Sequence, residues 1–206
     1  ALISKAKGLE AEGISTYVYE GSYRLPLKTV TDSIIKDFLT IDKIIGIGEI
    51  AVSDHRSSQP TFEEFSRATA DARVGGMLSG KAGIVNVHLG GGKRKLELLT
   101  RVVEETEIPI TQFLPTHANR TPELLTACIE FAKKGGTIDF TASEDPDFWE
   151  RTDGEVRFSK ALKQLIEPGV SLDHFTMSSD GQGSLPYFDE KNHFLGMGVG
   201  SAKSLL

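Results

Sequence analysis

The chain has 206 residues, a formal net charge of −6 and one cysteine. This length supports one substantial core and is short for two domains. Hydrophobic residues make up 39% of the chain and are spread along it, which argues against disorder as the main state. The sequence contains no run of about 18 apolar residues, the length that a membrane-spanning helix needs. The acidic balance argues against a nucleic-acid partner. The lone Cys128 excludes an intramolecular disulfide and fits a reducing compartment, so we expect a cytoplasmic protein.

Apolar residues alternate between strand and helix patterns along the chain. We predict strands where β-branched or nearly continuous apolar runs follow turn residues, and helices where apolar residues recur every three to four positions. The predicted strands are 14–19, 44–52, 83–88, 109–115, 137–142 and 172–178. The predicted helices are an opening one near 2–9, then 31–43, 60–76, 93–106, 121–136 and 158–167. Thr31 or Asp32 is expected to cap the helix over 31–43. The run Pro-Thr-Phe-Glu-Glu at 60–64 has the cap and acidic first turn of a helix start.

This strand and helix alternation predicts an α/β fold with a mainly parallel sheet. A doubly wound open sheet and a (β/α)8 barrel both satisfy it. Gly90-Gly91-Gly92-Lys93 has neither Rossmann nor Walker spacing, so nucleotide binding is weakly supported. Polar residues gather at the carboxyl ends of the predicted strands, where the active sites of barrels form, and this favours the TIM-like barrel.

Four residues of metal-ligating types lie in or just after predicted strands. They are Glu49, His88, His117 and Asp180. Carboxylate and imidazole groups bind zinc, and one carboxylate can bridge two ions. Glu49 interrupts an apolar strand, and an unpaired buried carboxylate costs several kcal/mol, so it needs a cation or a strong donor. The alternatives are that each His is a hydrogen-bonded structural group and that Asp180 caps the turn after it. His174 and His193 lack this placement, and we expect them at the surface.

Three segments resemble the isoaspartyl (β-aspartyl) dipeptidases, which belong to the amidohydrolase superfamily of metal-dependent barrels. They are Ser-Asp-His-Arg-Ser at 53–57, Leu-Pro-Thr-His-Ala-Asn-Arg at 114–120 and Ser-Ser-Asp-Gly-Gln-Gly-Ser at 178–184. The similarity extends along essentially the whole chain. It implies a zinc metallo-dipeptidase that cleaves the β-aspartyl peptide bond of small dipeptides by attack of a metal-bound hydroxide. It also implies two divalent metal ions, with zinc expected, and a homo-oligomer in the full-length form.

The resemblance assigns roles to individual residues. His88 and His117 match the two histidines on the more exposed metal. Asp180 matches the aspartate that binds the other metal and handles the proton of the attacking water. Glu49 stands where the best-known members carry a carboxylated lysine, so it is expected to bridge the two metals.

The remaining matched residues concern the substrate. Arg56 and Arg120 match arginines that bind its carboxylates, Tyr23 matches a tyrosine that polarises the scissile carbonyl, and Ser184 matches a serine lining the pocket. The residue chemistry agrees, because an isoaspartyl dipeptide carries two carboxylates and arginine suits bidentate carboxylate recognition.

Two parts of the family pattern are missing from the sequence. The His-x-His pair of the first barrel strand is absent, and so is the acid that holds the substrate amino group. The resemblance therefore implies that residues 1–206 are part of a single catalytic barrel domain, covering about strands 3–8. The first strands and a small β domain would lie outside this sequence. Two alternatives stay open: another amidohydrolase of the cyclic-amidase or aminoacylase type, and a catalytically silent barrel fragment or binding module.

Overall fold

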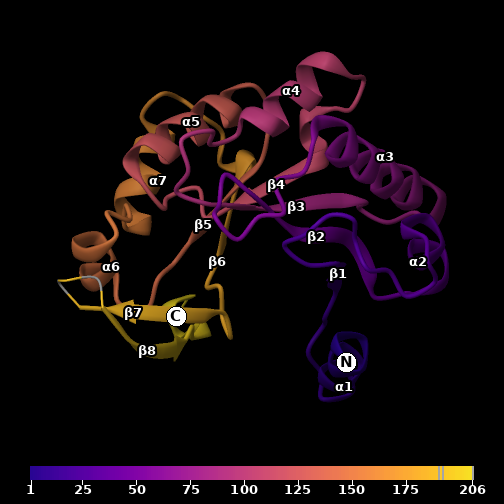
Figure 1. Cartoon of the computed structure of the whole chain (residues 1–206), viewed down its shortest axis with the longest axis horizontal. Coiled ribbons are helices and arrows are strands. Elements are labelled where there is room, and N and C mark those ends of the chain that lie inside the picture. Colours follow the sequence, from indigo (N-terminus) through magenta and orange to yellow (C-terminus); the bar gives the residue numbers. More distant parts are fainter. Residues whose placement is uncertain (190, 192, 206) are drawn as a thin grey trace. The chain divides into compact units, whose positions relative to one another are not determined.

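The computed structural model describes residues 1–189, 191 and 193–205, in an α/β arrangement of two compact units, 1–115 and 116–206. Figure 1 shows the order of the elements. Unit 1 contains α1 (Leu2–Ala11), β1 (Val18–Glu20), α2 (Ile34–Thr40), β2 (Ile44–Val52), α3 (Phe62–Ser79), β3 (Ile84–Leu89), α4 (Glu97–Glu105), η1 (Ile110–Gln112) and β4 (Phe113–Thr116), whose last residue begins unit 2.

The strands of unit 1 form one sheet in the order β1-β2-β3-β4, with β2 parallel to both β1 and β3. The predicted strand at 44–52 is confirmed residue for residue as β2. Most of its residues are buried, as its apolar run predicts for a strand covered on both faces. Helices α2 and α3 lie side by side against this sheet (Figure 1), and their Phe38 and Phe65 are fully buried. The predicted mainly parallel α/β class is thus confirmed.

The helix ends of unit 1 differ in part from the sequence prediction. The cap of α2 is Ser33, whose hydroxyl accepts a hydrogen bond from Lys36 N at 3.3 Å, so the predicted Thr31 or Asp32 cap is wrong. Asp32 has φ +61°, whereas Ser33 has the extended backbone that an N-cap needs. Helix α3 begins after Thr61, as the sequence predicted.

Helix α3 continues past the predicted end at residue 76 to Ser79, and Gly80 closes it with φ +68°. Gly76 is a contact position inside the helix. A Cβ on it would lie 2.5 Å from Gly83 Cα, so the helix can approach the start of β3 only because this side chain is missing.

Unit 2 carries more secondary structure than the sequence predicted. It contains α5 (Pro122–Lys133), β5 (Ile138–Thr141), α6 (Pro146–Thr152), α7 (Phe158–Ile166), η2 (Leu172–His174), β6 (Phe175–Ser178), β7 (Ser184–Phe188), β8 (Phe194–Val199) and η3 (Ala202–Leu205). Strands β5 and β6 pair in parallel, and β7 and β8 form an antiparallel pair. The prediction of six strands therefore missed the β7–β8 hairpin, and it also missed helix α6.

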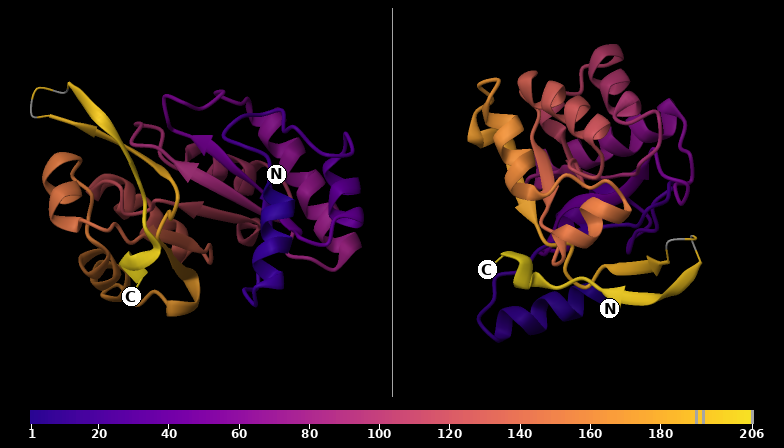
Figure 2. Two further views of the ribbon diagram at one scale, coloured as in Figure 1. Left: turned by 90° about the horizontal axis from the view of Figure 1, so that it is seen from below. Right: turned by 90° about the vertical axis from the view of Figure 1, so that its left-hand side faces the viewer.

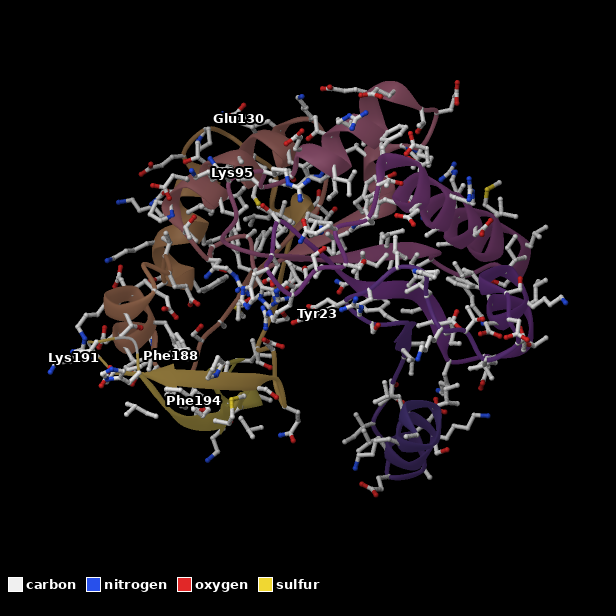
Figure 3. The ribbon with its side chains drawn as sticks, in the orientation of Figure 1. Tyr23, Lys95, Glu130, Phe188, Lys191 and Phe194 are labelled. Carbon is white, nitrogen blue, oxygen red and sulfur yellow. The ribbon has the colours of Figure 1, made fainter. Side chains whose placement is uncertain are left out.

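The hairpin escaped prediction because its strands contain residues that normally weaken strands. Pro186 lies in β7, and Gly196 and Gly198 lie in β8. Figure 2 shows the hairpin as an extended two-stranded ribbon, and Figure 3 labels Phe188 and Phe194 on it, whose ring centroids are 5.9 Å apart. Both phenylalanines are exposed, whereas Tyr187 of β7 packs against Phe148 and Trp149 of α6, with ring centroids 5.6 and 5.8 Å apart. Among the described helices of the chain, none has the length and apolar character needed to cross a membrane.

Candidate functional site

Unit 1 brings five of its polar residues together at the carboxyl ends of β1, β2 and β3. Glu49 lies in β2 and His88 in β3, where His88 pairs with Ala51 across the two strands. Asp54 and Arg56 follow β2, and Tyr23, labelled in Figure 3, follows β1. Carboxyl ends of parallel strands meet at one edge of a sheet, which explains how residues up to 65 positions apart become neighbours.

The imidazole of His88 lies between two carboxylates. Its Nδ1 is 3.2 Å from Glu49 Oε2, and its Nε2 is 3.1 Å from Asp54 Oδ2. The side chains of His88 and Asp54 are 3% and 4% exposed, whereas that of Glu49 is 27% exposed. The Nε2 edge of the His88 ring is therefore covered by the buried Asp54, and Nδ1 lies next to the more accessible Glu49.

Arg56 and Asp54 form a bidentate ion pair. Arg56 Nε donates to Asp54 Oδ1 at 3.0 Å, and Arg56 Nη2 donates to Oδ2 at 2.9 Å. Burial alone would raise the pKa of Asp54, but the hydrogen bonds and positive charge of Arg56 hold it well below its usual range. The guanidinium also lies over the ring of Tyr23, 5.2 Å from its centroid, and that ring is 4.5 Å from His88.

The segment that carries Tyr23 is fixed by backbone hydrogen bonds. Ala51 N donates to Tyr23 O at 3.1 Å, and Leu25 N donates to the Ser58 hydroxyl at 3.0 Å. At the other end of the segment, both oxygens of the buried Asp37 carboxylate accept backbone N–H groups, from residue 30 at 2.5 Å and residue 31 at 2.9 Å. Tyr23 is thereby held beside His88 and Arg56.

The ligand atoms of Glu49 and His88 are placed so that both could bind one divalent metal ion. Two ligand atoms bound to one zinc at about 2.05 Å, with a tetrahedral angle between the bonds, lie about 3.3 Å apart. The observed Glu49 Oε2 to His88 Nδ1 separation of 3.2 Å matches this spacing. A carboxylate oxygen and an imidazole nitrogen are also the donor types that zinc takes, so the residues present fit the metal.

In unit 2, the buried His117 is oriented by a hydroxyl. Its Nδ1 is 2.7 Å from Thr141 Oγ1, which leaves Nε2 on the opposite side of the ring. Its backbone has φ +62°. The fully buried Asn119 fixes this turn, because its amide donates to the carbonyls of Thr141 and Val156 and its Oδ1 accepts from Thr141 N at 2.8 Å.

A second buried acid organises the strands around His117 and Asp180. Both oxygens of Asp139 accept hydrogen bonds from hydroxyls, those of Thr116 at 2.7 Å and of Thr176 and Ser178 at 2.6 Å each. Thr116 immediately precedes His117, and Ser178 lies two residues before Asp180. Asp139 therefore holds the ends of two strands that carry predicted ligands.

Arg120 follows the same turn, and its backbone N donates to His117 O at 3.0 Å. Two acids lie within its electrostatic reach. Burial raises the pKa of both Asp153 and Glu155, and the positive charge of Arg120 opposes this rise in each. The Ser143 hydroxyl donates to Glu155 at 2.6 Å and also opposes the rise. Arg120 thus belongs to a charged cluster of unit 2.

Asp180 and Ser184 are exposed. Asp180 has φ +48° in the turn after β6, and its backbone oxygen accepts from Gly183 N at 2.9 Å. No hydrogen bond of its carboxylate is found within the described part of the chain, so the backbone and not the side chain closes the turn. Ser184 opens β7, and His193 is exposed and 3.0 Å from Asp189.

Sequence reasoning missed Asp54 as a functional residue, although the segment that contains it was singled out. The available signal was an Asp-x-Arg spacing directly after a buried strand, because an aspartate readily accepts from the backbone two residues on. Arg56 N does donate to Asp54 Oδ1, at 2.7 Å. The contact with His88 spans 34 positions and has no local signal.

No protein-family model matches the chain. Among solved structures it is similar to a β-aspartyl dipeptidase of the thermophilic keratin-degrading Fervidobacterium islandicum AW-1, in complex with β-Asp-Leu dipeptide. The identity is 53% and the TM-score 0.88, over 98% of this chain and 52% of that one. A second structure of the β-aspartyl dipeptidase from the same organism gives 50% identity and a TM-score of 0.84, over 98% of this chain and 49% of that one.

A phosphotriesterase homology protein from Escherichia coli, complexed with phosphate in its active site, shares the fold alone. Its identity is 16% and its TM-score 0.57, over 84% of this chain and 60% of that one. The chain spans about half the length of the β-aspartyl dipeptidases that it matches. The resemblance to the isoaspartyl (β-aspartyl) dipeptidases, first carried by three sequence motifs, is confirmed at 50–53% identity over nearly the whole chain.

Proposed function

We propose that this chain is part of a metal-dependent hydrolase that cleaves the β-aspartyl peptide bond of dipeptides. The observation that carries the proposal is the Glu49 and His88 pair, which has the donor types and the spacing of two zinc ligands. The similarity to a dipeptidase crystallised with β-Asp-Leu supports the substrate class.

The proposed metal ligands are Glu49, His88, His117 and Asp180, with Glu49 as the bridge between two divalent ions. Zinc is the ion we propose, since imidazole and carboxylate ligands suit it. Such ions, when bound, lower the pKa of water and polarise a carbonyl. Asp180 is exposed, which suits a carboxylate that takes a proton from water and returns it to the leaving amine.

The remaining residues are proposed to handle the dipeptide. Arg56 and Arg120 bind its carboxylates, Tyr23 donates to the oxygen of the scissile carbonyl, and Ser184 contacts the substrate. The Tyr23 ring next to His88 supports its role, because a phenol there is close to a metal ligand. Arg56 has a side chain that is 42% exposed, so part of the guanidinium remains accessible to a ligand.

For the whole protein we propose the architecture that the sequence suggested. Residues 1–206 would form about strands 3–8 of one (β/α)8 barrel domain, and the likeness to the phosphotriesterase homology protein supports the fold. A homo-oligomer and a cytoplasmic location remain predictions, the latter resting on the lone Cys128.

The test compares the 206-residue chain with a chain extended at both ends to the length of the matched dipeptidases. Bound metal is measured by elemental analysis, and hydrolysis of β-Asp-Leu is followed by release of leucine. We expect the extended chain to bind metal, to hydrolyse the dipeptide, and to lose activity with a chelator.

Two variants of the extended chain sharpen the test. Glu49→Gln should lower bound metal and activity together, because the amide carries no charge. His193→Gln, at an exposed histidine outside the proposed site, should leave both unchanged. Activity that survives chelation would overturn the metal mechanism. Hydrolysis of N-acyl amino acids or cyclic amides in place of β-Asp-Leu would favour another amidohydrolase. An extended chain that binds no metal and hydrolyses none of these substrates would favour the silent fragment.

A further inference from the structure

We propose that Asp54 is a positioning residue that fixes both a metal ligand, His88, and a substrate-binding residue, Arg56. This inference rests on the proposed function and adds a residue to it. Asp54 itself is not expected to touch the metal or the dipeptide, because its side chain is only 4% exposed and its oxygens are already engaged.

Four hydrogen-bonding contacts of the Asp54 carboxylate divide it between Arg56 and His88, and the exposed His55 Nδ1 lies farther off, 3.8 Å from Oδ1. Oδ1 accepts from Arg56 N at 2.7 Å and from Arg56 Nε at 3.0 Å. Oδ2 accepts from Arg56 Nη2 at 2.9 Å and lies 3.1 Å from His88 Nε2. An ionised carboxylate has about four acceptor sites, so these contacts nearly saturate it.

The contact between Asp54 and His88 matters for metal binding because it affects which ring nitrogen of His88 carries the proton. With its proton on Nε2, His88 donates to Asp54 and presents the Nδ1 lone pair toward Glu49. With its proton on Nδ1, His88 donates to Glu49, and Nε2 accepts from Arg56 Nη2, which is 3.0 Å away. Only the first tautomer offers Nδ1 to a metal shared with Glu49. A carboxylate at Nε2 favours that tautomer, as carboxylates behind metal-binding histidines commonly do.

The contact with Arg56 matters for the substrate. The fork between Arg56 and Asp54 uses Nε and Nη2, which leaves Nη1 uncommitted to Asp54 and holds the guanidinium plane in one orientation. A guanidinium held this way loses less side-chain entropy when it binds a carboxylate. One buried acid therefore aligns the two halves of the proposed site.

The central test is Asp54→Asn in the extended chain. The amide has nearly the same shape but loses the charge, and its NH2 group would face donors of Arg56 or His88. We expect zinc affinity, measured by competition with a chromophoric chelator on the metal-free protein, to fall about 10- to 100-fold. In the zinc-saturated protein we expect KM for β-Asp-Leu to rise about 10-fold or more, with a smaller change in kcat.

A double-mutant cycle separates the two contacts. Arg56→Gln should raise KM and leave zinc affinity unchanged, since Asp54 still holds His88. Adding Asp54→Asn to Arg56→Gln should lower zinc affinity while raising KM little further. Asp189→Asn is the matched control, because Asp189 also contacts a histidine, His193 at 3.0 Å, on the exposed hairpin. It should change neither quantity.

The outcomes distinguish this inference from the proposed function. If the unchanged extended chain binds no zinc and leaves β-Asp-Leu intact, the proposed function fails. If that chain is active and Asp54→Asn alters neither zinc affinity nor KM, only the positioning role fails. Should Asp54→Asn not fold, Arg56→Gln decides: a loss of zinc affinity there would overturn the division of roles, and retained affinity with raised KM supports it.

Discussion

The two units hold their predicted ligands by different means. In unit 1, ionisable side chains hold one another, since Glu49, Asp54, Arg56 and His88 form one continuous cluster. In unit 2, His117 is held by a threonine hydroxyl and by a turn that Asn119 ties to backbone groups. The placement of His88 in unit 1 depends on the ion pair between Asp54 and Arg56, whereas the placement of His117 depends on neutral hydrogen bonds.

The units differ in their apolar packing as well. The sheet of unit 1 has strand β2 buried along most of its length, whereas unit 2 contains a hairpin with exposed phenylalanines. We therefore expect substitutions of the same kind to have unequal effects in the two units.

The largest expected difference concerns two phenylalanines. Phe65 is fully buried on α3 and stacks on Phe113 with centroids 5.7 Å apart, so Phe65→Ala should destabilise the chain by about 3–5 kcal/mol. Phe194 is 58% exposed on the hairpin, so Phe194→Ala should change stability by less than about 0.5 kcal/mol. Urea unfolding measures both. Equal losses would mean that the hairpin packs against something as firmly as the sheet does.

A somewhat smaller loss of stability is expected when the neutral hydrogen bonds that support His117 in unit 2 are removed. Asn119→Ala removes the partner of three backbone groups, two at the half-buried Thr141 and one at the buried Val156, and should cost about 3 kcal/mol. Stability is again read from urea unfolding, and Asn119→Asp serves as a second variant that keeps the acceptor. If Asn119→Ala is neutral, the turn that carries His117 has another support.

The smallest of the three effects concerns a buried acid of unit 1. Burial, followed by interaction with Asp37, raises the pKa of Glu20 to about 8. The native state therefore holds a proton that the unfolded chain releases above its ordinary pKa of 4.5, so stability should fall as pH rises from 4.5 to about 8 and level off beyond. The change between pH 5.5 and 8 should be on the order of 2 kcal/mol.

Thermal unfolding across that range checks the sign. Glu20→Gln should flatten the pH dependence, and Glu130→Gln, at an exposed acid on α5, should leave it as it is. A pH dependence that is unchanged in Glu20→Gln would contradict the assignment of the proton to Glu20.

Local sequence signals predicted the best-defined parts of the fold. The apolar run at 44–52 gave β2, and Thr61 with Glu64 gave the start of α3, because strand burial and helix capping act over a few residues. The hairpin was missed because Pro186 and two glycines mask its strand pattern. The position of Asp54 against His88 was missed because it depends on two strands pairing in one register. Placement in or just after predicted strands singled out Glu49, His88, His117 and Asp180 as ligand types. Tyr23 and both arginines came from matching motifs, which the local pattern alone would not have separated from structural roles.

The hydrogen bonds that fix the segment carrying Tyr23 affect the entropy cost of binding a substrate. The N–H groups of residues 30 and 31 bond the Asp37 carboxylate, and the segment is also tied at Tyr23 and Leu25. Fixing one residue's backbone costs about 1–2 kcal/mol of conformational entropy. Since folding has already ordered these residues, a ligand that meets Tyr23 would bind a preformed surface, and the anchored amides should exchange slowly with deuterium both before and after it binds.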